Sequence, residues 1–267
     1  MNDVSHDAYC SDISSRTDEL RAAVRRAPAG PAGTPVPTCP GWSLTQLARH
    51  VGGTHRWAAR IVRTRAAGPV PHDLVDDVFS PGPETPAALD DWLADGAAEL
   101  IGALLDAGPD APVWTVAPGG TARFWARRMT HETTLHAADA AFVTGAPFAV
   151  REDLARDALD EWMDFGSLPR VLAAAGPDAP PLTGPGHTLH LHATDVLHAE
   201  WLVDLTEEPI TWGHTHAKAA VAVRAPLTDL VLLLYGRRTP ADASLEVFGD
   251  GALLTLWLER TGFWLRK

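Results

Sequence analysis

The feature that most constrains the fold of this chain is a change in hydrophobic period at a Pro/Gly-rich segment, residues 173–186. Before this segment, apolar residues recur at helical spacing. After it, they alternate over short runs, as they do in strands that bury one face. The sequence therefore predicts a mostly α-helical domain over residues 1–175 and a small α+β domain over residues 184–267.

Capping residues mark the helices of the first domain. We expect helices over residues 7–26, 43–67, 85–107 and 121–143, and a fifth from about residue 151, which together predict a bundle. Ser43 with Gln46 three residues later is a capping-box pattern, and Thr85 precedes a proline at the first helical position. Gly52 costs a helix interior about 1 kcal/mol relative to alanine, which indicates that something approaches the backbone closely there.

The second domain is predicted from alternating runs. We expect strands over residues 187–194, 201–206, 217–224 and 245–248, with helices over residues 228–235 and 252–259.

Composition excludes several classes of protein. A net charge of −12 argues against binding to a nucleic-acid backbone, which needs a basic face. No run approaches the roughly 18 apolar residues that a membrane span needs. The first 15 residues have no apolar core of the kind found in signal peptides. The two cysteines, Cys10 and Cys39, are too few for a disulfide framework, so we expect a cytoplasmic protein.

One helix carries the chemistry. At 100° per residue, Glu132, His136 and Asp139 share the face of Trp125 and Met129 on the helix over residues 121–143. A carboxylate in an apolar stripe is costly unless it is paired or bound to a metal. Because Glu132 and His136 are four residues apart, both side chains reach one point above the helix. Asp139 is placed to hold the other imidazole nitrogen of His136.

The remaining ligand of such a site should come from a facing helix. His131 lies five residues before His136, about 140° away around the helix, and so it does not share that site. The helix over residues 43–67 offers His50 and His55, of which the helical wheel slightly favours His55. The alternative to a metal site is a hydrogen-bonded polar network without a metal.

Two motifs resemble those of a known family. PVPTCPGWSLTQLARHVGGTHRW (from Pro35) and FWARRMTHETTLHAADA (from Phe124) are similar to segments of the mycothiol-dependent maleylpyruvate isomerase family. HTLHLHATD, AEWLV, VRAPLTDLVLLLYGRR and LEVFGDGALL resemble the C-terminal domain of that family. The resemblance covers residues 17–259, and the motifs occur in the family's order.

The resemblance implies a DinB-like four-helix bundle that holds a divalent metal, zinc or another, followed by the small α+β domain. The implied ligands are the histidine of the LxxH helix and the Glu-x-x-x-His pair, which are His50, Glu132 and His136 here. The family thus decides against His55 as a ligand. His55 and Trp42 become candidates to line the cofactor pocket, together with Trp125, although we favour a core position for His55.

The implied cofactor is mycothiol, the small thiol of actinobacteria. Its thiolate, activated by the metal in the open fourth position, would add to an electrophilic small molecule. Expulsion after rotation gives cis–trans isomerisation of a maleylpyruvate-like acid, and retention of the adduct gives S-transfer. In the family an arginine of the C-terminal domain is thought to reach the site, and Arg224 and Arg237 are the candidates because arginine suits carboxylates.

Other interpretations remain open. The chain is alternatively a catalytically inactive ligand-binding module, or a metal-dependent hydrolase of thiol conjugates that acts through bound water. We interpret Cys39 as part of the family's turn motif. His190 and His192 lie on one strand face, where a two-histidine metal site is conceivable and packing or a domain interface is preferred. The sequence does not indicate an oligomeric state.

Overall fold

The computed structural model describes residues 4–27, 30–71, 82–117, 120–169 and 180–262. It divides into two compact units, residues 3–148 and residues 149–267, the second of which also takes in residues 1 and 2. No helix among the described residues has both the length and the apolar character needed to cross a membrane.

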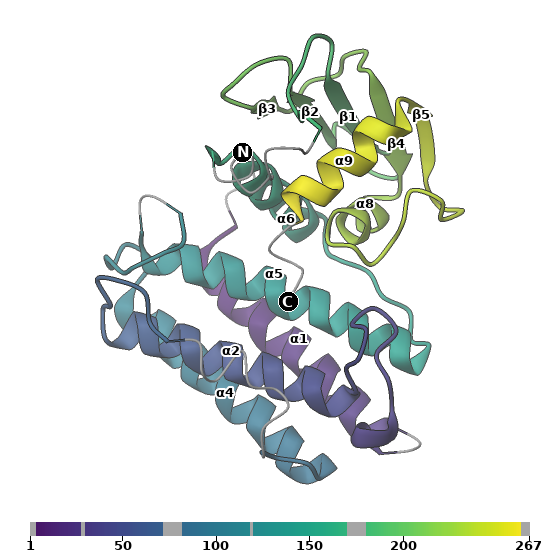
Figure 1. Ribbon diagram of the computed structural model, residues 1–267. Coiled ribbons are helices and arrows are strands. Elements are labelled where there is room, and N and C mark those ends of the chain that lie inside the picture. Colours follow the sequence, from purple (N-terminus) through teal and green to yellow (C-terminus); the bar gives the residue numbers. More distant parts are fainter. Residues whose placement is uncertain (1–3, 28–29, 72–81, 118–119, 170–179, 263–267) are drawn as a thin grey trace. The chain divides into compact units, whose positions relative to one another are not determined.

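The first unit is a helical bundle (Figure 1). Helix α1 packs against α4 and α5, and α2 also packs against α4 and α5. Its core includes Leu20, Leu44, Leu47, Leu89 and Leu93, all of them almost fully buried. The helices are α1 (His6–Arg26), α2 (Leu44–Arg63), α4 (Pro86–Ala107) and α5 (Ala122–Thr144), with a short 3-10 helix η1 (Pro31–Gly33) before α2.

Capping residues fix where these helices begin. The capping box of Ser43 and Gln46 is present at α2, and the Thr85 hydroxyl accepts a hydrogen bond from the backbone of residue 88 at α4. Both signals had been predicted from the sequence. A side chain at Gly52 would place its Cβ 2.3 Å from the indole nitrogen of Trp92, so the expected close approach is the contact of α4 with α2.

The second unit contains a mixed five-stranded sheet in the order β3-β2-β1-β4-β5. Strand β1 runs parallel to β4, and the other neighbours are antiparallel. The elements are α6 (Glu152–Gly166), β1 (Thr188–Ala193), β2 (Glu200–Asp204), β3 (Thr211–Gly213), β4 (Val221–Ala225), α8 (Leu227–Leu234), β5 (Glu246–Gly249) and α9 (Gly251–Thr261).

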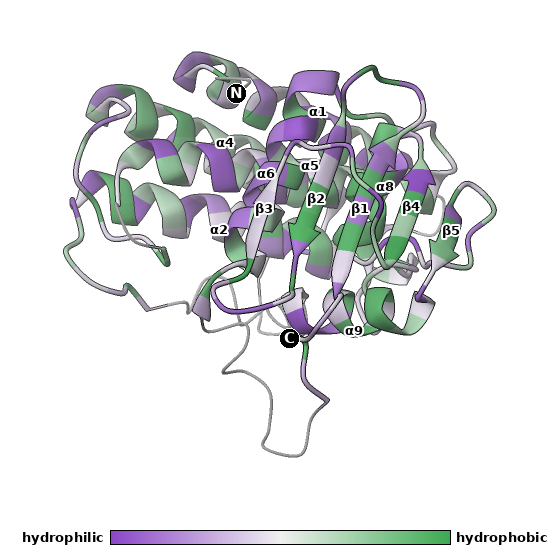
Figure 2. Ribbon diagram, turned by 90° about the horizontal axis from the view of Figure 1, so that it is seen from above, coloured by the Kyte–Doolittle hydropathy of each residue, from purple (hydrophilic) through white to green (hydrophobic). Residues whose placement is uncertain are grey.

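The two faces of this sheet differ in character. Leu189, Leu191, Trp201 and Val223 share one face and are buried. The Trp201 indole donates a hydrogen bond to Asp160 of α6, and α6 contacts α8 and α9, so these helices cover that face. The inner strands β2, β1 and β4 carry both hydrophobic and hydrophilic segments in Figure 2. The opposite face carries the polar side chains of β1 and β2.

The structure confirms the predicted fold class, mostly helical with a small α+β part, and corrects two details. Helix α6, expected as a fifth bundle helix, packs against α8 and α9, so the division lies between Phe148 and Ala149 instead of near residue 175. The amphipathic pattern of α6 does not say which core it covers. Strand β3 was not expected. Residues 173–179, the first half of the Pro/Gly-rich segment over residues 173–186, lie outside the described residues.

Candidate metal centre

Helix α5 supplies two of the three predicted ligands. The four-residue spacing brings Nε2 of His136 to 3.2 Å from Oε1 of Glu132. The other carboxylate oxygen, Oε2, accepts a hydrogen bond of 2.8 Å from Arg128, one turn earlier on the same helix. The side chain of Glu132 is therefore held from both sides, with Oε1 turned toward His136.

Helix α2 supplies the third predicted ligand. Nε2 of His50 lies 3.3 Å from Oε1 of Glu132, and the rings of His50 and His136 are 5.0 Å apart, edge to face. One ligand atom from each of His50, Glu132 and His136 lies within 4.8 Å of the other two. The structure thus brings together the three residues that the family resemblance implied.

His55, which the helical wheel favoured, lies elsewhere on α2. Its Nε2 donates to the hydroxyl of Thr133 at 2.8 Å, because that hydroxyl gives its own proton to the carbonyl of Met129. Only 1% of the His55 surface is exposed. His55 is therefore a core residue behind the cluster, and nothing in its contacts makes it part of an accessible pocket.

Asp139 holds His136 from the far side, as the sequence predicted. Nδ1 of His136 donates a hydrogen bond of 2.8 Å to Oδ2 of Asp139. The same carboxylate accepts hydrogen bonds from Thr38 at 2.6 Å and from Cys39 at 3.4 Å. This network commits Nδ1 of His136 and leaves Nε2 to face Glu132. Cys39 has a structural role here, as interpreted from the turn motif.

The electrostatics of the cluster follow from these contacts. Burial acts to raise the pKa of Glu132, but hydrogen bonds from His136 and His50 and the charge of Arg128 hold it well below its ordinary value. Burial acts to lower the pKa of His136, whereas its hydrogen bonds, that to Asp139 foremost, hold it well above the ordinary value. Burial lowers the pKa of His55 to about 3, so this imidazole is neutral.

Two aromatic residues predicted near the site occupy different environments. The ring of Trp42 lies 5.1 Å from that of His50, so Trp42 borders the cluster. Trp125 is almost fully buried and packs against Trp57 at 5.0 Å, and its indole donates to the carbonyl of Trp114. Trp125 is part of the core of the bundle.

His131 does not join the cluster, in agreement with its position around the helix. It is buried and meets Tyr9 of α1 edge to face at 6.5 Å.

The donors fit a divalent metal of the zinc class. Two imidazole nitrogens and one carboxylate oxygen are the ligands that zinc takes in proteins, and three protein ligands leave one position open. The orienting carboxylate behind His136 is a usual partner of a metal-bound imidazole. The side chain of Glu132 is 24% exposed, so the cluster is reachable, while His50 and His136 are 3% and 9% exposed.

Sequence reasoning missed two residues of this network. Arg128 lies four residues before Glu132, and the ion-pair spacing on a helix is a signal that would have found it. Thr38 lies in the loop before α2, where no periodic pattern relates it to Asp139.

The predicted arginines lie in the second unit. Arg224 is on β4, where its guanidinium is 3.4 Å from the carboxylate of Glu246. Arg237 follows α8 and donates a hydrogen bond of 2.7 Å to the carbonyl of Tyr235. A role for either at the metal cluster stays a prediction.

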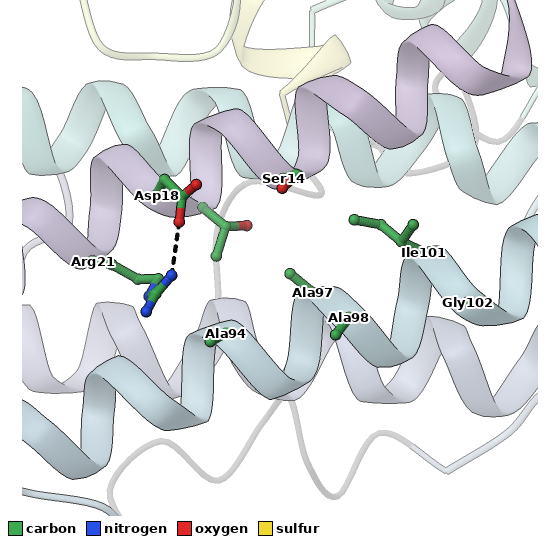
Figure 3. Close-up of a pocket in the computed structure, with 9 residues that line it drawn as sticks. Ser14, Asp18, Arg21, Ala94, Ala97, Ala98, Ile101 and Gly102 are labelled. Carbon is green, nitrogen blue, oxygen red and sulfur yellow. Dashed lines mark hydrogen bonds and ion pairs between the residues drawn. The ribbon is translucent and has the colours of Figure 1, made fainter.

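A separate pocket lies between α1 and α4 and shares no residue with the cluster (Figure 3). Asp18 and Arg21, joined by an ion pair of 2.8 Å, line one end, and small side chains such as Ala94 and Ala98 line the wall on α4. Nothing in this lining offers a set of metal ligands.

Known proteins similar to this chain share both units. The family described as the mycothiol maleylpyruvate isomerase N-terminal domain matches residues 13–141, and the C-terminal domain of that family matches residues 153–256. A search of the curated proteins gives no match.

Two solved structures have a similar fold. One is a mycothiol-dependent maleylpyruvate isomerase, with 15% identity and a TM-score of 0.59. The other is a mutant of such an enzyme in which a histidine is replaced by alanine, with 15% identity and a TM-score of 0.60. Each match covers 92% of this chain and 93% of the other.

Proposed function

Because the chain belongs to the mycothiol-dependent maleylpyruvate isomerase family, we propose that it is a metal-dependent enzyme that uses mycothiol to isomerise a small cis-unsaturated acid. The observation that carries this proposal is the convergence of His50, Glu132 and His136 between α2 and α5. An isomerase that resembles maleylpyruvate isomerase needs a place for a thiol, and a site with three protein ligands offers one.

The proposed metal is Zn²⁺, held by the three side chains of the cluster. When bound, zinc lowers the pKa of a thiol that coordinates it, so that the thiolate is present at neutral pH. His50 and His136 would bind through Nε2, and Glu132 through Oε1, the three atoms that already face one another.

The surrounding side chains position these ligands. Asp139 keeps the proton of His136 on Nδ1, and Arg128 fixes the second oxygen of Glu132. Trp42 covers one side of His50 with an apolar surface, which excludes water from that side. The pair Arg128 and Asp139 therefore prepares the geometry before any ligand arrives, which lowers the free-energy cost of binding.

An arginine of the second unit completes the proposal. We assign Arg237 or Arg224 to the carboxylate of the substrate, since a guanidinium binds a carboxylate through two parallel hydrogen bonds. A substrate that carries an alkene conjugated to a carbonyl, together with one carboxylate, meets both requirements. We place the enzyme in the cytoplasm, where a small-molecule thiol stays reduced.

The test uses the purified full chain with zinc, mycothiol and maleylpyruvate. We expect conversion to the trans isomer with no net consumption of mycothiol. Absorbance and chromatography measure this conversion. Consumption of one thiol per turnover would identify an S-transferase, and release of an amine from a thiol conjugate would identify a hydrolase.

The matched variants are Glu132→Gln, which removes a ligand and keeps the size of the side chain, and Glu207→Gln in an exposed loop. We expect Glu132→Gln to lose both stoichiometric zinc and activity, and Glu207→Gln to keep both. Full activity in Glu132→Gln, or in wild-type protein stripped of metal, would overturn the proposal. Metal binding by wild type without any turnover would favour a ligand-binding module.

A further inference from the structure

A second group of histidines surrounds a carboxylate on the open face of the sheet. Residues 190 and 192 are two apart on β1, so their side chains lie on the same face of the sheet. The register places Glu200 of β2 directly opposite His192. A third imidazole arrives from the loop after β3. We call this group the sheet cluster, and its members are His190, His192, Glu200 and His216.

Each imidazole of the sheet cluster contacts the same carboxylate. Nε2 of His190 lies 2.8 Å from Oε2 of Glu200, and Nδ1 of His216 lies 2.5 Å from that oxygen. Nδ1 of His192 lies 3.2 Å from the other oxygen, Oε1. The rings of His190 and His216 meet edge to face at 5.2 Å, so the three imidazoles enclose one small volume above Glu200.

This composition is that of a metal site. Three imidazoles and one carboxylate are four nitrogen and oxygen ligands, the number that closes a tetrahedral zinc site. Tetrahedral zinc with ligands at about 2.0–2.1 Å separates its ligand atoms by roughly 3.3 Å. The contacts between imidazoles and carboxylate, at 2.5–3.2 Å, need to change by less than about 1 Å to reach that spacing. All four ligand atoms already lie within 4.8 Å of one another.

The charge around the sheet cluster also suits a cation. Glu200 is the acidic group of the sheet cluster, and its Oε2 accepts hydrogen bonds from His190 and His216. Arg224, the neighbour of His192 on β4, pairs with Glu246 at 3.4 Å, which offsets its charge.

The exposure of the ligands gives a route for an ion to enter. The side chain of His190 is 7% exposed and that of His192 is 29% exposed, whereas that of His216 is 77% exposed. An ion from solvent would meet His216 first and would then be enclosed by ligands fixed on two paired strands.

We propose that the sheet cluster is a second divalent-metal site, of the zinc class, distinct from the site between α2 and α5. Its four protein ligands leave no position open, so its role is structural. It ties β1 and β2 to the loop that follows β3. The proposal does not depend on the proposed catalysis, because no residue is shared with the bundle site.

The experiment counts zinc ions bound by the full chain after removal of metal, by competition with a chromophoric chelator. We expect two equivalents in wild type, one in Glu132→Gln, one in the double variant His192→Ala/His216→Ala, and none when the three substitutions are combined. The exposed His198, outside the cluster, gives the control His198→Asn, which should bind two. The variant that combines the three substitutions should also lose the thermal stabilisation that zinc gives to Glu132→Gln.

Wild-type stoichiometry in the double variant would overturn the proposal and would show a cluster held by hydrogen bonds alone. If the double variant does not fold, His216→Ala decides, because so exposed a side chain is not needed for folding. We expect His216→Ala to weaken the second equivalent at least tenfold, and unchanged affinity would overturn the proposal. One equivalent retained in Glu132→Gln and lost on adding the sheet substitutions supports the sheet site even if the enzyme assay fails.

Discussion

The two histidine clusters of this protein differ in how their ligands are held. In the bundle, Glu132 and His136 come from adjacent turns of one helix, and each is fixed by a further charged side chain, Arg128 or Asp139. In the sheet cluster, two imidazoles from β1 and one from a loop converge on Glu200 of β2, and one of them, His216, is largely exposed. A single helix therefore holds its candidate ligands in place through neighbours on adjacent turns. On the open sheet face, the candidate ligands come from separate segments, and one of them lies in solvent.

The comparison extends to single histidines, and here we expect the largest effect. Burial lowers the pKa of His55 to about 3, against about 6.5 in an unfolded chain. The unfolded state gains a proton between these values while the folded state does not, so the free energy of unfolding falls as the pH drops. From pH 7 to pH 5 this group should account for a loss of about 2 kcal/mol.

Urea denaturation of metal-free protein at both pH values measures this loss. His55→Gln should remove that part of the pH dependence, and the exposed control His198→Asn should keep it. If His55→Gln shows the same pH dependence of the unfolding free energy as wild type, then the burial of His55 does not lower its pKa as the structure indicates.

The next effect concerns the packing that places His50. A Cβ at Gly52 would meet the indole of Trp92 of α4, so Gly52→Ala should lower the free energy of unfolding by about 1–2 kcal/mol after the gain in helix propensity. Gly102→Ala is the control, because no atom lies within 4 Å of the added carbon, and it should stabilise α4 by up to about 1 kcal/mol. Chemical denaturation measures both, and equal effects would contradict the close contact of α2 with α4.

Substituting Asp139 distinguishes the two proposed metal sites. Asp139→Asn keeps the size of the side chain but removes the charge that orients His136, so zinc affinity at the bundle should fall by about 10–100-fold. Affinity at the sheet cluster should not change. Chelator competition measures the zinc affinity of each cluster in a variant that lacks the ligands of the other. A similar fall in affinity at both clusters would contradict the independence of the two proposed sites.

The smallest effect belongs to the surface. Hydrogen bonds from Arg21 hold the pKa of Asp90 below its ordinary value. This carboxylate therefore stabilises the fold above the unfolded pKa, and the contribution is lost as the pH falls through the lower folded pKa. Because the pair is partly exposed, Asp90→Asn should cost at most about 1 kcal/mol at pH 7, with a smaller difference at pH 3. Thermal unfolding at both pH values provides the check.

The parts of the fold that follow local rules were predictable from sequence. The first residues of α2 and α4 follow from Ser43 and Thr85, and the meeting of Glu132 with His136 follows from the helical repeat. The choice of His50 over His55 depended on family resemblance. A helical wheel gives the angle of each residue around its own helix, but it does not say which of these angles faces α5.

Long-range placements were not predictable in this way. The unit to which α6 belongs is decided by the cores available to its apolar face, and β3 is too short to show a period. Likewise, His190 and His192 were visible as a pair on one strand, but no local pattern brings His216 to them. Strand pairing and loop closure decide such contacts.

The stripe of Arg128, Glu132, His136 and Asp139 along α5 has a consequence for selectivity. The stripe holds two carboxylates and one guanidinium, which pairs with Glu132, so it offers a single excess negative charge to a divalent ion. The occupied site would then carry net positive charge in a largely buried setting, where charge is poorly screened. The site should therefore bind a ligand with an anionic sulfur or oxygen more tightly than a neutral molecule of the same size.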